Sequence, residues 1–141
     1  MKKLIFIGFL SALLFPIIWS RFIDLEIAKG FLRNYPVQVF GVCSMTGINA
    51  VGAFWVMNKL FKHKSGAFFG LLTRLGAAFI TGTTMTLASY LIMTFSGHKS
   101  SFLWMADVAG MPSFYSAFVS YWIVKLFVAT SSSRDSIRTP R

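Results

Sequence analysis

Apolar residues fall into four long runs along the chain, and short polar turns separate them. The runs cover approximately residues 4–23, 37–60, 67–95 and 102–127. Each run holds about the 20 apolar residues that an α-helix needs to cross the hydrocarbon core of a bilayer. The pattern therefore predicts an all-α membrane protein in which residues 1–130 form one domain of four transmembrane helices.

The third run is too long for a simple crossing, since an α-helix rises only about 1.5 Å per residue. Arg74 interrupts this run. We expect the membrane-spanning part to be residues 75–95, after a partly buried turn over residues 66–73. Arg74 would then lie at the interface and extend its charge toward water. In the fourth run, Pro112 predicts a kink.

The first run begins directly after Lys2 and Lys3, as the apolar part of a secretory signal does. Small residues do not alternate at its end in the way a cleavage site requires, so we expect an uncleaved signal anchor. Residues 21–35 then place apolar side chains on one side at helical spacing. This predicts a short amphipathic helix in the membrane interface, ended by Pro36. A polar connection is the alternative, because Gly30 interrupts the pattern.

Basic residues are distributed unevenly over the turns. The turn after the second run holds Lys59, Lys62 and Lys64, whereas the turn after the third holds only Lys99. Cytoplasmic loops carry the excess of Lys and Arg, so the first of these turns should be cytoplasmic. Alternate threading places both ends of the chain in the cytoplasm, including a polar basic tail, residues 131–141, that we expect to be disordered.

Tryptophans and two isolated cations fall close to the predicted membrane boundaries, where amphipathic side chains prefer to lie. The predicted interfacial anchors are Trp19 and Trp104 outside, and Trp55, Trp122, Arg74 and Lys125 toward the inside. The lysine-rich start and the sharp charge bias together favour the inner membrane of a bacterial cell, with multiple passes.

Composition supports lipid as the solvent. Hydrophobic residues make up 55% of the chain and charged residues only 13%, with sixteen Phe among 141 residues. A net charge of +10 would suggest nucleic-acid binding in a water-soluble protein. Here the bases lie at the edges of apolar runs, where they meet anionic lipid headgroups, so we expect no nucleic-acid partner.

Candidate catalytic and metal-binding groups are scarce in the sequence. Cys43 is the single cysteine, and His63 and His98 belong to turns on opposite sides of the predicted membrane. We therefore expect no metal site, no cofactor and no enzymatic activity, because nucleophile, base and orienting group do not occur together.

Asp107 is the one acid inside an apolar run, about 7 to 8 Å below the predicted outer boundary. Such a carboxylate suggests a proton or cation site, although one this shallow also reaches water. Asn49, Thr81 and Thr84 complete a candidate polar site within the membrane. They indicate either a hydrophilic path or hydrogen bonding between and within helices.

Small residues recur at helical spacing on the last three runs, and such faces let helix backbones approach closely in lipid. The predicted packing positions are Gly47, Ala50, Ala77, Gly110 and Ser113. These faces serve packing within the bundle, self-association, or binding to other membrane subunits. We hypothesise a non-enzymatic subunit of a homo-oligomer or of a larger transport, secretion or assembly complex. The alternative is a minimal transporter or channel that uses Asp107 and a threonine-lined path.

Overall fold

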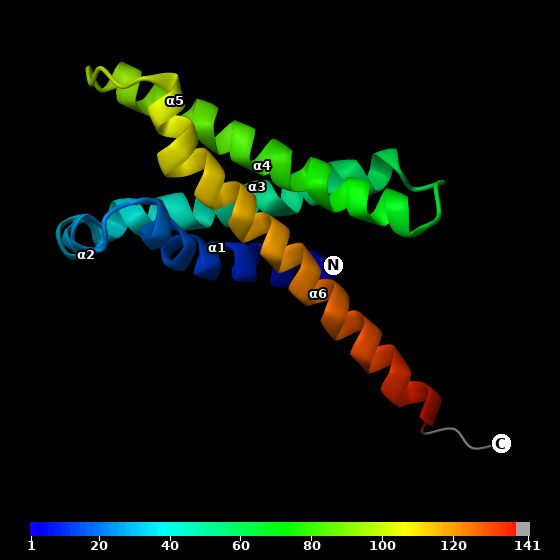
Figure 1. Cartoon of the computed structure of the whole chain (residues 1–141). Helices are drawn as coiled ribbons and strands as arrows, with labels where there is room; N and C mark the ends of the chain where they lie inside the picture. Colours follow the sequence, from blue (N-terminus) through cyan, green and yellow to red (C-terminus); the bar gives the residue numbers. More distant parts are fainter. Residues whose placement is uncertain (138–141) are drawn as a thin grey trace.

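The computed structural model describes residues 1–137, with side chains described through Thr130, and every regular element in that range is helical (Figure 1). The helices are α1 (Lys2–Phe22), α2 (Leu25–Asn34), α3 (Pro36–Leu60), α4 (Ala67–Phe95), α5 (Phe102–Met105), the π-helical turn η1 (Ala106–Gly110) and α6 (Met111–Ile137). Four helical stretches are long and apolar enough to span a membrane: α1, α3, α4 and the continuous stretch Phe102–Thr130. The predicted all-α fold with four such helices is confirmed.

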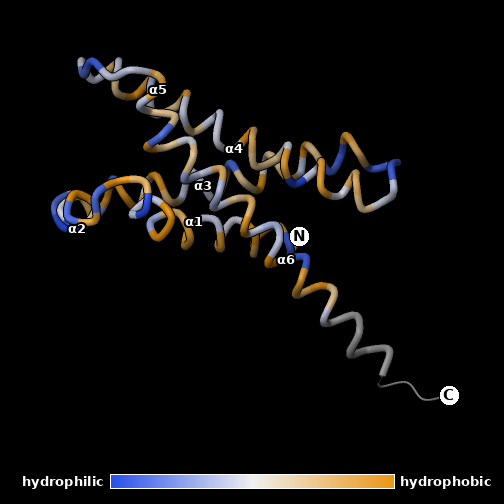
Figure 2. Tube along the Cα trace, viewed as in Figure 1, coloured by the Kyte–Doolittle hydropathy of each residue, from blue (hydrophilic) through white to orange (hydrophobic). Residues whose placement is uncertain are grey.

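The four long helices form a ring in which each neighbour runs antiparallel to the next. Helices α1 and α4 each pack against both α3 and α6. Contacts between aromatic rings show that α6 runs antiparallel to α1. Phe6 lies against Phe127 (ring centroids 6.1 Å apart) and Phe22 lies against Tyr115 (5.8 Å). Apolar residues continue along the helices, while hydrophilic residues concentrate near their ends (Figure 2).

Glycines set the distance between the helices at two crossings. A Cβ atom on Gly47 of α3 would lie 2.6 Å from the carbonyl oxygen of Gly8 in α1. A Cβ atom on Gly82 of α4 would lie 2.9 Å from the carbonyl oxygen of Gly110 in η1. Both distances are shorter than side chains tolerate, so these backbones touch because the side chains are absent.

Helix α2 occupies part of the segment for which the sequence predicts an amphipathic helix. Its first turn is capped by Asp24, whose Oδ1 accepts a hydrogen bond from the backbone N–H of Glu26 at 2.8 Å. Ala28 is its buried residue and packs with Phe15 and Trp19 of α1. Most other side chains of α2 are exposed.

Helix α4 begins at Ala67, so residues 67–73 are helical and not the turn that the sequence analysis expected. Arg74 does not interrupt the helix, because its stem lies along the preceding turn and its Nη1 donates to the carbonyl of Gly70 at 2.8 Å. A charged side chain at a membrane boundary limits how far a helix enters the hydrocarbon of the bilayer. It does not disturb the backbone hydrogen bonds of that helix. Gly66, with φ of 129°, marks where the helix starts.

The fourth stretch contains a local irregularity at the place where the sequence predicts a kink. The π-helical turn η1 ends directly before Met111 and Pro112. Proline lacks the N–H that an α-helical hydrogen bond needs, and its ring crowds the preceding turn. The backbone hydrogen bonds there therefore span one residue more than in an α-helix.

Helix α6 continues to Ile137, so part of the tail expected to be disordered, residues 131–137, has helical backbone. Extending an existing helix orders only one residue for each hydrogen bond gained. A short run of serines can therefore continue the helix. Residues 138–141 of the predicted tail lie outside the described residues.

Candidate functional site

Asp107 lies in the first turn of η1, and its side chain is exposed. Within the part of the chain that the structure describes, no ion pair or hydrogen bond joins it to another side chain; the ion pair found there links Lys29 to Glu26 at 3.0 Å. The sequence-predicted site residues Asn49, Thr81 and Thr84 make their contacts elsewhere. The four residues therefore do not form one hydrogen-bonded cluster.

The threonine hydroxyls bond to the backbone of their own helix. Thr81 donates to the carbonyl of Ala77 at 2.8 Å, and Thr84 lies 2.8 Å from the carbonyl of Ile80. Asn49 donates its amide to the sulfur of Met85 at 3.1 Å. These bonds satisfy each hydroxyl within α4, although Thr81 is buried and Thr84 is exposed.

Two hydrogen-bonded contacts cross between α3 and α6 inside the bundle. Tyr121 is 2% exposed and donates its hydroxyl to the carbonyl of Ala50 at 2.9 Å. The hydroxyls of Thr46 and Ser113 lie 3.4 Å apart. The sequence analysis missed Tyr121, although it follows the small-residue face of α6 and could have been found from that periodicity.

The predicted packing residues all lie inside the bundle. Gly47, Ala50, Ala77, Gly110 and Ser113 are buried. The sequence analysis did not single out Gly8, which faces Gly47 and is followed one turn later by Ala12, a small-x-x-x-small pair that was available as a signal. The small-residue faces therefore serve packing within the chain first.

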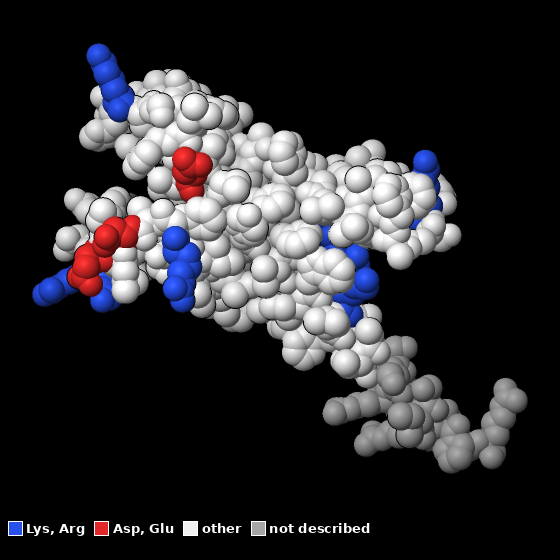
Figure 3. All heavy atoms as spheres, viewed as in Figure 1, with Lys and Arg blue, Asp and Glu red and all other residues white. Residues whose placement is uncertain are grey.

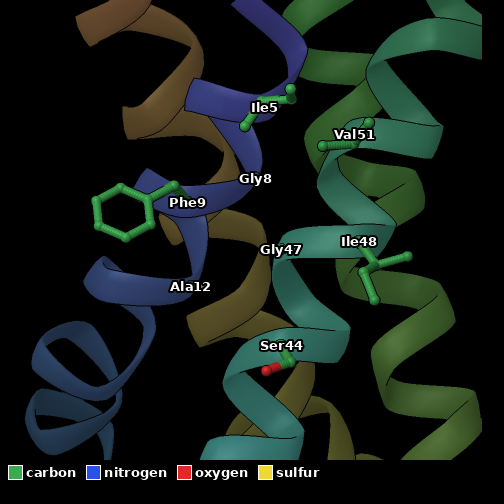
Figure 4. A pocket seen from close by; sticks show the side chains of 8 residues that line it. All are labelled: Ile5, Gly8, Phe9, Ala12, Ser44, Gly47, Ile48 and Val51. Carbon is green, nitrogen blue, oxygen red and sulfur yellow. The ribbon is translucent and has the colours of Figure 1, made fainter. Parts of the chain in front are cut away.

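One crossing of small residues also reaches the outer surface of the bundle. A shallow groove of about 290 Å³ runs between α1 and α3 (Figure 4). Gly8 and Gly47 form its floor, and Ala12 and Ser44 extend it along the two helices. Its rim carries large apolar side chains, of which Ile5, Phe9 and Ile48 are exposed. The full lining is Ile5, Gly8, Phe9, Ala12, Ser44, Gly47, Ile48 and Val51.

The two ends of the bundle differ in charge. One end, which we call the basic end, collects the starts of α1 and α4 and the end of α3, with α6 beside them. Its described charged residues are all cationic: Lys2, Lys3, Lys59, Lys62, Lys64, Arg74 and Lys125. The opposite, mixed-charge end holds Arg21, Asp24, Glu26, Lys29, Arg33, Lys99 and Asp107. Figure 3 shows acidic atoms only toward the α2 end of the visible face.

Aromatic rings accompany the cations at the basic end. Lys59 Nζ lies 5.2 Å from the ring centroid of Trp55, and Lys3 Nζ lies 5.7 Å from that of Phe54. Trp122 contacts both Arg74 and Lys125. At the other end, Trp104 is exposed, but Trp19 is only 8% exposed and packs edge-on against Phe31 of α2. The predicted anchor at Trp19 is thus covered by protein.

Comparison of the chain with protein-family models, with curated proteins and with solved structures finds no match. Among the side chains that the structure describes, no three His, Cys, Asp or Glu residues lie close enough together to hold a metal ion. Three features of the described residues are candidates for function: the α1/α3 groove, the basic end and Asp107.

Proposed function

We propose that the chain is a multi-pass protein of the inner membrane with its basic end, and both chain termini, on the cytoplasmic side. The support is the separation of charge: cations without described acids at one end, and mixed charges at the other. Lys and Arg near the ends of spanning helices favour the cytoplasmic side. Helix α2 then lies near the outer surface, where its exposed apolar residues suit the membrane interface.

We further propose that it is a non-enzymatic subunit that works by associating with a second copy of itself. The segments outside the long helices are α2 and short turns, so most of the surface that a partner meets belongs to the helices. The α1/α3 groove carries the proposal. Its floor is formed by small residues of two helices that already touch each other, so it leaves room for a large side chain of a second copy.

The rim of the groove supplies the complementary surface. Phe9 is 60% exposed and Ile48 is 72% exposed, and they flank the groove on the outer sides of α1 and α3 (Figure 4). In a two-fold dimer the same patch occurs on both subunits, so the rim of one copy fills the groove of the other. Association would place this subunit in a homo-oligomer, or through it in a larger transport, secretion or assembly complex.

Filling the groove tests this proposal. Ser44→Phe places a ring in the groove, and Ile48→Ala removes atoms from its exposed rim. We expect the native chain in mild detergent to have twice the mass of one chain by light scattering. Both variants should shift it to one chain, because the added ring blocks the groove and the alanine shortens the rim that would enter it.

Thr83→Phe is the matched control. Thr83 is exposed on α4, away from the groove, and its hydroxyl bonds only to its own helix. It should leave the dimer unchanged. A native chain that runs as a monomer, or a co-purifying protein that S44F releases in place of a second copy, would contradict the homodimer.

A second candidate function is a minimal ion or solute transporter, and the π-helical turn at Asp107 favours it. Such turns recur at functional sites, and this one holds the single acid of the fourth stretch. Asp107→Asn should then abolish proton- or cation-coupled flux in liposomes while membrane insertion stays normal. Flux equal to that of the native chain would exclude Asp107 as the coupling group.

A further inference from the structure

Two cations at the basic end share one aromatic ring. The guanidinium carbon of Arg74 in α4 lies 5.4 Å from the ring centroid of Trp122 in α6. The ammonium nitrogen of Lys125, also in α6, lies 4.9 Å from the same centroid. Because the two distances meet at one point, the two charges are at most about 10 Å apart.

Like charges held this close repel each other, and the described part of the chain offers no compensation. The three acids with described side chains, Asp24, Glu26 and Asp107, lie at the mixed-charge end. One N–H of Arg74 donates a hydrogen bond to the carbonyl oxygen of Gly70. Its remaining donors and the three of Lys125 have no described acceptor. An anion from outside the chain would satisfy both.

The cluster joins side chains of two long helices, α4 and α6. Helices α4 and α6 separate toward the basic end (Figure 1), and basic atoms are visible on that side of the molecule (Figure 3). Arg74 and Trp122 are half-buried, whereas Lys125 is exposed. The same turn of α6 also exposes large apolar side chains, those of Leu126 and Phe127. A ligand that joins a negative headgroup to an apolar tail matches both surroundings.

We propose that this cluster binds the phosphate group of an anionic phospholipid. The guanidinium of Arg74 suits a phosphate because its planar donors can contact two oxygens, and Lys125 adds a point charge from the other helix. Trp122 holds both cations in place by cation–π attraction. The acyl chains lie along the apolar surfaces of α4 and α6. The site links the two helices where they diverge, so the bound lipid stabilises the basic end of the bundle.

The test is a titration of the detergent-solubilised full chain with phosphatidylglycerol, followed by native mass spectrometry. We expect one lipid to bind with a defined Kd, and Arg74→Gln or Lys125→Gln each to raise that Kd about tenfold, the loss of one charge-assisted contact. Lys99→Gln, which removes a cation at the mixed-charge end, should leave the Kd unchanged. Phosphatidylcholine should bind far more weakly than phosphatidylglycerol.

Separate arms distinguish a lipid from a free phosphate. Inorganic phosphate and glycerol phosphate at the same concentrations should not compete with the lipid, because they lack the acyl chains. Competition by either would make the site a soluble-anion site and overturn the lipid assignment. Equal Kd values for the native chain, R74Q and K125Q would show that the lipid binds elsewhere. If R74Q fails to fold, K125Q alone decides between these results, because Lys125 is exposed.

Discussion

Single glycines decide how closely the helices pack. At Gly47 the added methyl group of alanine would meet the backbone oxygen of Gly8, which cannot move without shifting all of α1. Gly52, on the same helix, is exposed and would meet no atom within 4 Å. Both positions are glycines of α3, but their surroundings are opposite. Comparing the two alanine variants therefore separates the effect of packing on stability from the effect of helix propensity.

We expect Gly47→Ala to lower the free energy of unfolding by about 1–3 kcal/mol, the usual cost of inserting a methyl group into a filled interior. Gly52→Ala should have no such cost and should gain a few tenths of a kcal/mol or more from helix propensity. Reversible unfolding in mixed detergent micelles, followed by circular dichroism, measures both. A Gly47→Ala chain as stable as Gly52→Ala would show that α1 and α3 do not touch here.

At the scale of elements, the sequence predicts the number and type of the helices because apolar runs and strong breakers coincide. Pro36 begins α3 and Gly66 precedes α4, as local chemistry requires. The sequence predicts too late a start for α4, because Arg74 interrupts the apolar run without interrupting the helix. A membrane boundary and a helix boundary are independent: charge governs the first and backbone hydrogen bonding the second.

The candidate site was less accessible to sequence reasoning. The small-residue faces could be found from spacing, but which faces pair depends on the order of helices in the ring. The pairs Gly8–Gly47 and Gly82–Gly110 therefore appear only in the structure. The same holds for Trp122, because its two cations come from α4 and α6. Residue spacing alone does not predict that these two helices touch. The π-helical turn likewise depends on Pro112 and on the fit of Gly110 against α4.

At the scale of the whole molecule, the charge separation and the antiparallel ring make one orientation preferable to the other. The basic end and the mixed-charge end are joined by helices long enough to cross a membrane. The proposed dimer, ion site and lipid site all require those helices to lie in lipid, since the groove and its apolar rim would otherwise be exposed to water. Orientation also decides which leaflet supplies the lipid at Trp122.

Cysteine labelling in right-side-out membrane vesicles tests the arrangement most directly. Cys43→Ser removes the single cysteine, and Ser65 and Ser96 are exposed in the turns at the basic and the mixed-charge end. On that background, Ser96→Cys should react with a membrane-impermeant maleimide, and Ser65→Cys should react only after the vesicles are opened. Labelling of Ser65→Cys in sealed vesicles with protection of Ser96→Cys, or recovery of the chain in the soluble fraction, would contradict the account.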